Sequence, residues 1–397
     1  MISKRGMAGA AGLAVAFGVV WLARAQFESS VVAQSVQAPM FEVDPFWPRP
    51  LPNDWLLGSA IGVSVDAQDV IWMVHRGNLT GGEAGAVGDN PSAECCRPAP
   101  PVLAFDLEGN VVHAWGGEAG ATYQGVEWPS SNHGIFVDHE GFVWIGGNGG
   151  GDSHILKLTQ DGDVVAQYGR ANARADASGS FVRGSHDTES FGRVAKIFVD
   201  PVENEVYLAD GYFNRRVAVL NQETGRVVRY WGAYGNPPDD DYAHPPGGAV
   251  SQQFRGPVHC ADVSVDRLVY VCDRGSRRIQ VFTTEGEFVR EAFFGDIGSS
   301  TWDVAFSPDP QQTYMYIPDG ANQRVRVVLR ETMEELTNFG QGGRYPGMFF
   351  GAHSIATDSQ GNIYTTETYE GKRIQKFTYM GMGPVRARVQ GPPWPPR

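Results

Sequence analysis

The sequence predicts an all-β, six-bladed propeller with four-stranded blades, and three observations lead to this prediction. One segment recurs along the chain: a strand, a tight turn and a second strand that opens at an aromatic residue. Its strands alternate apolar and polar residues, and no stretch has the period of an amphipathic helix. Four short strands per unit, repeated about six times, are typical of blades around a central channel, whereas a sandwich or barrel lacks such long self-similarity.

The recurring segment forms the inner half of each predicted blade. In five copies the aromatic stands eleven residues after the first position, and a longer variant from Trp302 to Tyr316 completes the set. The five regular copies are IGVSVDAQDVIW from Ile61, HGIFVDHEGFVW from His133, KIFVDPVENEVY from Lys196, HCADVSVDRLVY from His259 and HSIATDSQGNIY from His353.

The outer half of each blade follows the aromatic residue. A short run ends in an acidic residue, a polar turn leads into an alternating strand, and a Gly-bearing turn leads into a last strand. Asp210, Asp273 and Asp319 end such runs, and we expect them to tie blade turns together. The last unit has only three strands. We therefore expect residues 41–48, FEVDPFWP, to supply the fourth and close the ring, which removes exposed strand edges.

The N-terminus has the layout of a secretory signal. Lys4 and Arg5 precede an apolar run over residues 7–22, and cleavage is expected after Ala25. An uncleaved membrane anchor is the alternative, although the run is short for a span. In both cases the rest of the chain is exported, to the periplasm or the medium. The predicted organisation is a signal peptide (1–25), a linker (26–40), the propeller (41–385) and a Pro-rich tail (386–397).

Charge and composition narrow the classes of partner. The net charge is −13 with a pI near 5.2, and no basic cluster stands out, which excludes nucleic acid as an expected partner. The 50 Gly and 25 Pro fit a turn-dense β protein, with surface loops expected at residues 170–187 and 235–248. We expect a monomer that acts on a small molecule or a peptide.

Four cysteines in an exported chain should be largely oxidised. Cys260 and Cys272 flank one hairpin turn and are the first choice for a bridge. The adjacent Cys95 and Cys96 either pair with each other or stay as thiols. Zinc binding by this adjacent pair lacks a second cysteine pair to complete a tetrahedral site.

Three histidines occupy the first position of alternate copies. His133, His259 and His353 begin units two, four and six, so in a closed ring they lie about 120° apart and face one point on the axis. A single histidine at a strand start is more often structural. Three at one register change that balance, because the chain has only nine histidines. Three imidazoles leave a fourth zinc position open, so the sequence predicts a catalytic zinc site.

Further side chains are expected at the same mouth of the channel. Arg76 and Arg274 fall four residues after their aromatic, and Tyr212 falls five after Tyr207, at the ends of second strands. Arginines beside a metal hold a carboxylate in a bidentate pair, and a tyrosine near a cation can act as a base. Inter-blade salt bridges and turn packing are the alternatives. His75 is also a candidate for lining the mouth and binding substrate.

Several motifs surround these residues and carry a family resemblance. They are HRG at 75–77, NHGI at 132–135, ADGYFNRRV at 209–217, PVH at 257–259, DRGSRRIQVF from Asp273 and AHSIA from Ala352. Over nearly all of the predicted mature chain, the sequence resembles the peptidyl-α-hydroxyglycine α-amidating lyases, a branch of the NHL-repeat propellers. DGYFNRRV is shared by many NHL propellers, whereas the three spaced histidines together with HRG and DR are much more specific.

The resemblance implies a six-bladed propeller with a three-histidine zinc site and a structural calcium in the channel. It implies cleavage of the C–N bond of a carbinolamide, which converts a peptidyl-hydroxyglycine into a peptide amide and glyoxylate. The three registered histidines would be the zinc ligands. Arg76 and Arg274 would hold the substrate carboxylate, and Tyr212 would take the proton from the substrate hydroxyl.

Three positions depart from the family pattern. Ser354 stands where the family has an aspartate that serves the calcium, so the calcium site is expected to be lost or rebuilt. Gly351 stands where a larger apolar side chain is expected to face substrate, and the Cys95–Cys96 insertion lies outside the family pattern. The 397 residues include no hydroxylating monooxygenase domain, which leaves another hydroxylated amide open as the substrate.

Two other functions compete with the lyase. A zinc-dependent ester or lactone hydrolase would need a carboxylate base near the metal, for which Glu367 is the candidate. A non-catalytic NHL scaffold that binds a protein or peptide would be favoured if the histidines were dispersed.

Overall fold

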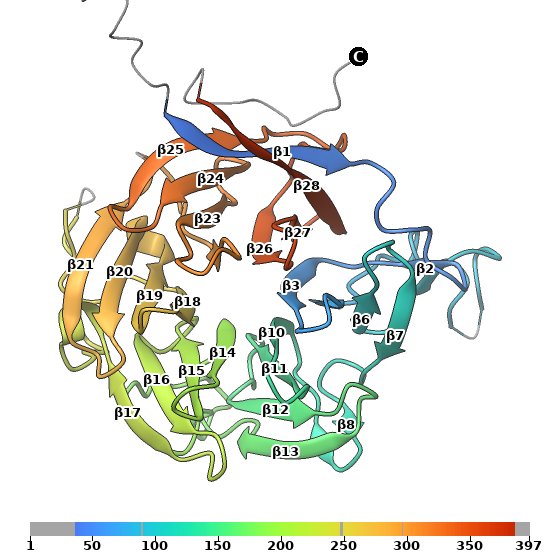
Figure 1. Ribbon diagram of the computed structural model, residues 1–397. Helices are drawn as coiled ribbons and strands as arrows, with labels where there is room; N and C mark the ends of the chain where they lie inside the picture. The colour runs from blue at the N-terminus through green and yellow to red at the C-terminus, as the bar shows by residue number, and fades with distance from the viewer. Residues whose placement is uncertain (1–35, 89, 247–248, 296, 386–397) are drawn as a thin grey trace, which may run out of the picture.

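The computed structural model describes residues 36–385 except 89, 247, 248 and 296, and it confirms a closed ring of six four-stranded blades (Figure 1). In each blade the first strand lines the channel and the last lies on the rim. Blade one is β3 (Ala60–Val65), β4 (Ile71–His75), β6 (Val102–Phe105) and β7 (Val111–Trp115). Blade two is β10 (Asn132–Val137), β11 (Val143–Gly147), β12 (His154–Leu158) and β13 (Val164–Gly169). Blade three is β14 (Lys196–Asp200), β15 (Glu205–Asp210), β16 (Arg216–Asn221) and β17 (Val227–Trp231).

The second half of the ring repeats the same antiparallel order. Blade four is β18 (Val258–Val263), β19 (Leu268–Asp273), β20 (Arg278–Thr283) and β21 (Phe288–Phe293). Blade five is β22 (Ala305–Phe306), β23 (Tyr314–Asp319), β24 (Arg324–Leu329) and β25 (Glu334–Phe339). Blade six is β26 (Ala352–Thr357), β27 (Ile363–Glu367), β28 (Arg373–Pro384) and, from the other end of the chain, β1 (Gln37–Asp44).

The N-terminal strand closes the ring, as the sequence predicts. β1 pairs antiparallel with β28, from Gln37 opposite Pro384 to Asp44 opposite Lys376. It begins inside the segment expected to be a linker. Phe41 on β1 is buried and packs against Phe339 of blade five at a ring separation of 5.2 Å. The closing strand therefore joins blades five and six through the core as well as through backbone hydrogen bonds.

The spacing between turn and aromatic that the repeats share has a physical cause in three blades. The indole of Trp72 donates to Asp66 at 2.9 Å, and the indole of Trp144 donates to Asp138 at 2.7 Å. In blade six the Tyr364 hydroxyl donates to a turn aspartate at 2.9 Å. Each turn aspartate thus satisfies the one polar atom of a buried ring, which fixes the distance between turn and ring.

The predicted structural role of the acidic residues after the aromatics is confirmed. Asp210, Asp273 and Asp319 are buried. Each accepts a hydrogen bond from an arginine on the third strand of its own blade. The pairs are Arg216–Asp210 at 2.8 Å, Arg278–Asp273 at 3.0 Å and Arg326–Asp319 at 2.5 Å.

Both cysteine pairs are joined in the structure. Cys260 on β18 and Cys272 on β19 form the expected bridge, with their Cα atoms 4.9 Å apart, within the range for disulfides. Cys95 and Cys96 are bonded to each other rather than left as thiols. The adjacent pair lies in the excursion between β4 and β6, where β2 (Trp55–Leu56) and β5 (Arg97–Pro98) form a small parallel ribbon.

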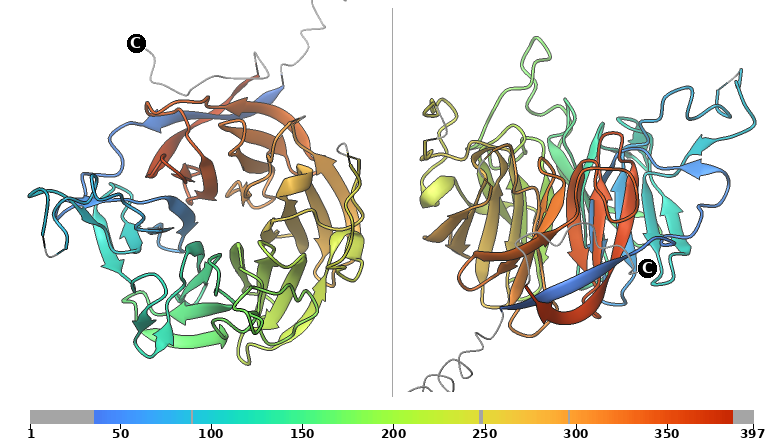
Figure 2. Two further views of the ribbon diagram at one scale, coloured as in Figure 1. Left: turned by 180° about the vertical axis from the view of Figure 1, so that it is seen from behind. Right: turned by 90° about the horizontal axis from the view of Figure 1, so that it is seen from above.

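Long connections rise from one face of the ring (Figure 2). One of them joins β13 to β14 and contains the whole of the segment expected to be a surface loop at residues 170–187. Its Arg183 donates to the carbonyl of Phe213, next to Tyr212, so these loops surround the mouth of the channel. None of the helices in the described residues is long and apolar enough to cross a bilayer. The predicted signal peptide (1–25), residues 26–35 of the linker and the tail (386–397) lie outside the described residues.

Candidate metal centre

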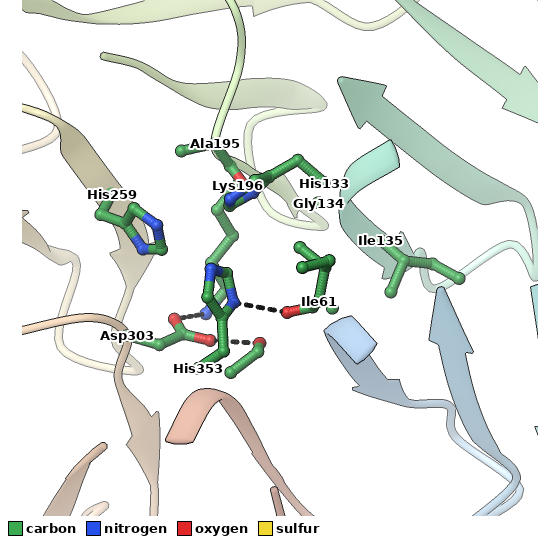
Figure 3. A pocket seen from close by; sticks show the side chains of 11 residues that line it. Ile61, His133, Gly134, Ile135, Ala195, Lys196, His259, Asp303 and His353 are labelled. Atoms are coloured by element: carbon green, nitrogen blue, oxygen red, sulfur yellow. Dashed lines mark hydrogen bonds and ion pairs between the residues drawn. The ribbon is translucent and has the colours of Figure 1, made fainter. Parts of the chain in front are cut away.

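Each of the three registered histidines lies within a β-bulge at the start of its blade. The pairing register shifts between Asn132 and Ile135, between Val258 and Ala261, and between Ala352 and Ile355. The residues in these gaps include His133, His259 and His353. A bulge releases a side chain from the strict alternation of a strand and redirects it. The three imidazoles therefore lie together at one pocket, as Figure 3 shows.

The three imidazoles form a nearly regular triangle. Ring centroids are separated by 5.0 Å for His133 and His259, 4.8 Å for His133 and His353, and 4.9 Å for His259 and His353. One ring nitrogen from each lies within 4.8 Å of the others, and all three side chains are buried. Residues from alternate blades, more than 90 positions apart in the chain, thus meet at one point as the sequence predicts.

Backbone carbonyls of the intervening blades orient the imidazoles. Nδ1 of His133 donates to the carbonyl of Ala195 at 2.6 Å, and Nδ1 of His353 donates to that of Ile61 at 2.7 Å. Nδ1 of His259 bonds the carbonyl of Trp302 in the same way. A carbonyl only accepts, so each Nδ1 carries the proton and each Nε2 keeps a free lone pair. This arrangement is typical of metal-binding histidines, whose second nitrogen is held by an outer partner.

The environment keeps these imidazoles neutral. Burial lowers the pKa of His133 and of His259 well below the usual value, and the neighbouring imidazole of His353 lowers both further. The charge of Arg274 acts in the same direction on both histidines, and that of Arg76 on His133. Burial first, and then the charges of the two arginines, lower the pKa of His353 to about 3. Neutral imidazoles with free Nε2 lone pairs are what a transition metal requires. A cavity of about 10 Å³ lined by all three side chains has room for one water-sized occupant.

Tyr212 and Arg274 join the triangle, as expected. The Tyr212 hydroxyl lies 2.9 Å from Nε2 of His133 and 3.0 Å from Nε2 of His259. Nη1 of Arg274 donates to the same hydroxyl at 3.3 Å. Burial raises the pKa of the Tyr212 hydroxyl, while the charges of Arg274 and Arg76 act in the opposite direction.

Arg76 is held at the same mouth by blade two. Nη2 donates to the side chain of Asn148 at 2.9 Å, and Nε donates to the carbonyl of Asn132, the residue before His133, at 3.3 Å. It makes no ion pair with a carboxylate within 4.0 Å among the described residues, and neither does Arg274. The inter-blade salt bridge considered as an alternative for these two arginines is therefore absent from the described part of the chain.

Trp302 is a site residue that sequence reasoning missed. Its indole lies against the guanidinium of Arg274 at 3.8 Å, a cation–π contact that fixes the guanidinium plane. Its carbonyl orients His259. The signal was present in the sequence, because Trp302 opens the blade-five segment just as the histidines open theirs. Tyr369 is a second missed residue, since its ring lies 6.4 Å from that of Trp302.

His75 is not brought into the triangle. Its ring is buried, Nε2 donates to the carbonyl of Pro100 at 2.9 Å, and Nδ1 accepts from the backbone amides of Gly58 and Gly77. Both ring nitrogens are therefore engaged by backbone, and none is left for the substrate contact expected of this residue. Its position instead supports the turn that carries Arg76.

The structure also shows the surroundings of Glu367, the candidate base, and of Gly351, where a larger side chain was expected. Glu367 is buried, bonded to Arg373 at 2.6 Å, and accepts from the backbone amide of Phe350, so its carboxylate is used by the fold. At Gly351, φ is +77°, and a Cβ would lie 3.2 Å from the ring of Tyr369. Tyr369 therefore takes the space in which a larger side chain at Gly351 was expected.

Comparisons with known proteins give relatives with NHL repeats, in agreement with the propeller fold, and a partial match to an enzyme. No family model matches the chain. It is 25% identical over 298 residues to NHL repeat-containing protein 3 of Mus musculus, covering 73% of this chain and 67% of that protein. It is 27% identical over 180 residues to peptidyl-glycine alpha-amidating monooxygenase B of Xenopus laevis, covering 44% of this chain and 18% of that protein.

A likeness to solved structures concerns the fold alone. A protein of unknown function from Bacteroides thetaiotaomicron matches with a TM-score of 0.50 at 13% sequence identity, covering 87% of this chain and 76% of that one. The chain is thus an NHL-like six-bladed propeller with distant, partial similarity to the amidating monooxygenases. It spans less than a fifth of the length of the monooxygenase that it matches.

Proposed function

We propose that this protein is a zinc-dependent lyase that cleaves the C–N bond of an α-hydroxy amide, releasing an amide and glyoxylate or a related aldehyde. The observation that carries the proposal is the contact of one phenol with two candidate metal ligands. The Tyr212 hydroxyl lies 2.9 Å from Nε2 of His133 and 3.0 Å from Nε2 of His259, so it can donate its one proton to either, and it also accepts from Arg274. A proton acceptor, a cation site and a carboxylate-binding group are thus adjacent.

The donor set fits zinc. His133, His259 and His353 supply three neutral nitrogen ligands and no carboxylate, which is the composition of open catalytic zinc sites. A zinc ion held there supplies Lewis-acid polarisation of a substrate oxygen. Calcium takes six to eight oxygen ligands, so this triangle is not a calcium site.

The two arginines suit the carboxylate end of the substrate. Each guanidinium is half-buried at the mouth and has no carboxylate partner within the described chain. Arg76 donates to Asn132 and Asn148, which leaves other N–H groups for a ligand. Arg274 donates to Ser299 and Tyr212, with the same result. Arginine offers five donors in a planar fork that matches a carboxylate. The proposal assigns Arg76 and Arg274 to hold the carboxylate from opposite sides of the triangle.

Tyr212 is assigned the proton of the substrate hydroxyl. Its pKa is raised by burial more than the two arginines lower it, so the isolated phenol stays protonated near neutral pH. The base role therefore requires additional positive charge at the histidine triangle. Tyr212 should therefore act as a base only in protein that has metal bound at the triangle. Lyase activity measured with and without metal tests this dependence.

The bond changes balance without a co-reactant. The hydroxyl proton moves to the Tyr212 oxygen, the C–O bond becomes a carbonyl, and the electrons of the C–N bond leave with the amide nitrogen. The proton taken up by the Tyr212 oxygen is then passed to the departing nitrogen, which regenerates the ionised phenol, so no net proton is taken up or released. Water exclusion at the buried triangle favours this elimination over hydrolysis of the amide.

The similarity to the amidating monooxygenases supports this substrate class. Their name describes amidation of a peptidyl-glycine, and the matched region covers 44% of this chain. A hydroxylated amide is the corresponding substrate class here. The match spans only a minor part of those proteins, so the whole activity of the relative is not carried over.

The structure offers less to the two rival functions. The hydrolase reading needed Glu367 as a base, and that carboxylate is occupied by Arg373 and Gln375. The scaffold reading expected dispersed histidines, whereas the three side chains are gathered and buried.

An exported, monomeric enzyme is part of the same proposal. Two disulfides are consistent with an oxidising compartment, and the N-terminal sequence resembles a signal peptide. Release of glyoxylate from α-hydroxyhippurate by the purified, zinc-loaded protein tests the activity. Absence of release from this compound and from other α-hydroxy amides would contradict it.

A further inference from the structure

Next to the histidine triangle, the channel contains a lysine side chain whose ammonium group lies between two aspartate carboxylates. Nζ of Lys196 lies 2.5 Å from Oδ1 of Asp303 and 2.9 Å from Oδ1 of Asp262. It also donates to the carbonyl of Val304 at 3.2 Å. The exposed fractions of the Lys196, Asp262 and Asp303 side chains are 11%, 10% and 3%. Figure 3 shows Lys196 and Asp303 beside His353.

The oxygens around this ammonium are of the kind that a hard divalent cation takes. Two carboxylates and a backbone carbonyl face one point, and the Ser354 hydroxyl donates to the other oxygen of Asp303 at 2.6 Å. Cys260 lies close to both aspartates, but its sulfur is bonded to Cys272 and is not available as a thiolate ligand. The acceptors are therefore assembled, and the position that they face is taken by a side chain.

We infer that Lys196 is a built-in cation that replaces a divalent metal ion in the channel, so that this propeller needs no calcium. A divalent ion could bind these oxygens only by displacing a buried ammonium that is covalently attached to β14. The ammonium satisfies all three of its donors with the three oxygens. Because it is tethered, it cannot dissociate at low ion concentration.

Charge agrees with this inference. One ammonium and two carboxylates carry a net charge of minus one, which is also the charge of a divalent ion with three carboxylates. Replacing the ion by a lysine therefore removes the need for a third carboxylate, and the neutral Ser354 hydroxyl is the group that contacts Asp303. A carboxylate at position 354 would add buried negative charge beside Asp303 and destabilise the cluster.

The cluster also supports the histidine triangle. Lys196 follows Ala195, whose carbonyl orients His133, and Asp303 follows Trp302, whose carbonyl orients His259. Ser354 follows His353 itself. Blades three, five and six are thus tied together directly beside the carbonyls that orient His133 and His259 and beside His353 itself, and blade four joins through Asp262.

Calcium dependence of thermal unfolding tests the inference. Wild-type protein and Lys196→Ala are prepared in calcium-free buffer and heated with and without millimolar calcium chloride, and bound calcium is measured after desalting. We expect no calcium in the wild type and no change in its Tm. Lys196→Ala should have a lower Tm without calcium, gain several degrees with calcium, and retain about one ion per chain.

Lys157→Ala is the matched control, because Lys157 is also a buried lysine near two carboxylates, Asp138 and Glu140, but lies on β12 away from the axis. It should lose stability without becoming responsive to calcium. Calcium bound to the wild type with a rise in its Tm would overturn the inference, as would a folded Lys196→Ala that ignores calcium. If Lys196→Ala does not fold in either buffer, the wild-type titration decides alone. None of these readouts depends on zinc or on lyase activity.

Discussion

Nδ1 of His353 donates a hydrogen bond to the carbonyl of Ile61 at 2.7 Å, and these residues lie 292 positions apart in the chain. The bond joins the last blade to the first at the axis, while at the rim β1 completes blade six by pairing with β28. The orientation of one candidate metal ligand therefore depends on closure of the ring. Fold and site are coupled at this contact.

Removing the closing contact at the rim should weaken both stability and metal binding. Phe41→Ala leaves a cavity beside Phe339 and Tyr316 and should lower the free energy of unfolding by about 3–5 kcal/mol. Urea unfolding measures the change. Phe46→Ala is the control, because Phe46 is 76% exposed, and it should shift stability by less than about 0.5 kcal/mol. Similar losses in the two variants would argue against the role of β1.

Removal of the Tyr212 hydroxyl should damage turnover more than binding. Tyr212→Phe keeps the ring and removes the proton acceptor, so kcat should fall about 10²- to 10⁴-fold with KM nearly unchanged. Bound zinc should stay at the wild-type level. Tyr168→Phe is the control, because that hydroxyl donates to Gln222 in blade three and lies outside the mouth. A rise in KM at constant kcat would show that Tyr212 binds substrate instead.

The arginine fork should govern recognition of the carboxylate. Arg274→Lys keeps the charge but loses the planar donors and the stacking on Trp302. One charged hydrogen bond contributes about 1.5–3 kcal/mol, so KM should rise about 10- to 100-fold. A substrate analogue with a methyl ester in place of the carboxylate should bind wild type and variant equally. A variant that weakens both compounds alike would contradict the assignment.

The lowered pKa of His75 should make the protein less stable in mild acid. Burial lowers its pKa from 6.5 to about 4 in the folded protein. The unfolded chain therefore binds more protons between these pH values, and the free energy of unfolding falls as pH decreases from about 6.5 to about 4. A single group contributes about 3 kcal/mol to that fall. Urea midpoints measured across this range should drop less in His75→Gln than in wild type.

The paired control for the acid effect is His113→Gln. His113 is partly exposed and lies near Asp161, so its replacement removes one imidazole from the chain without disturbing the buried ring of His75. An unchanged pH profile in His75→Gln would mean that other groups cause the acid loss.

The propeller and the histidine triangle were predictable because a repeat imposes geometry. Equal spacing to Trp144, Tyr270 and Tyr364 placed the histidines at one register, and ring closure then required them to converge. The Cys260–Cys272 bridge followed from one hairpin in the same way. These predictions needed only strand alternation and blade order.

The finer contacts depend on information that spacing does not contain. Bulges at the three histidines change where the imidazoles point, and bulges leave no local sequence signal here. The groups of Ala195 and Ile61 that orient the imidazoles are backbone carbonyls. Every residue type has such a carbonyl, so the sequence does not indicate this role. In the sequence, Lys196 is only the start of a copy without histidine, because its partners come from two other blades.

Zinc content is the most direct test of the central claim that three imidazoles share one ion. Wild-type protein loaded with zinc and desalted should retain about one zinc per chain by elemental analysis. His259→Ala should retain almost none, whereas His154→Ala, which removes a buried histidine bonded to Glu127 outside the triangle, should retain the wild-type amount. Equal zinc in wild type and His259→Ala, or none in the wild type, would contradict the account.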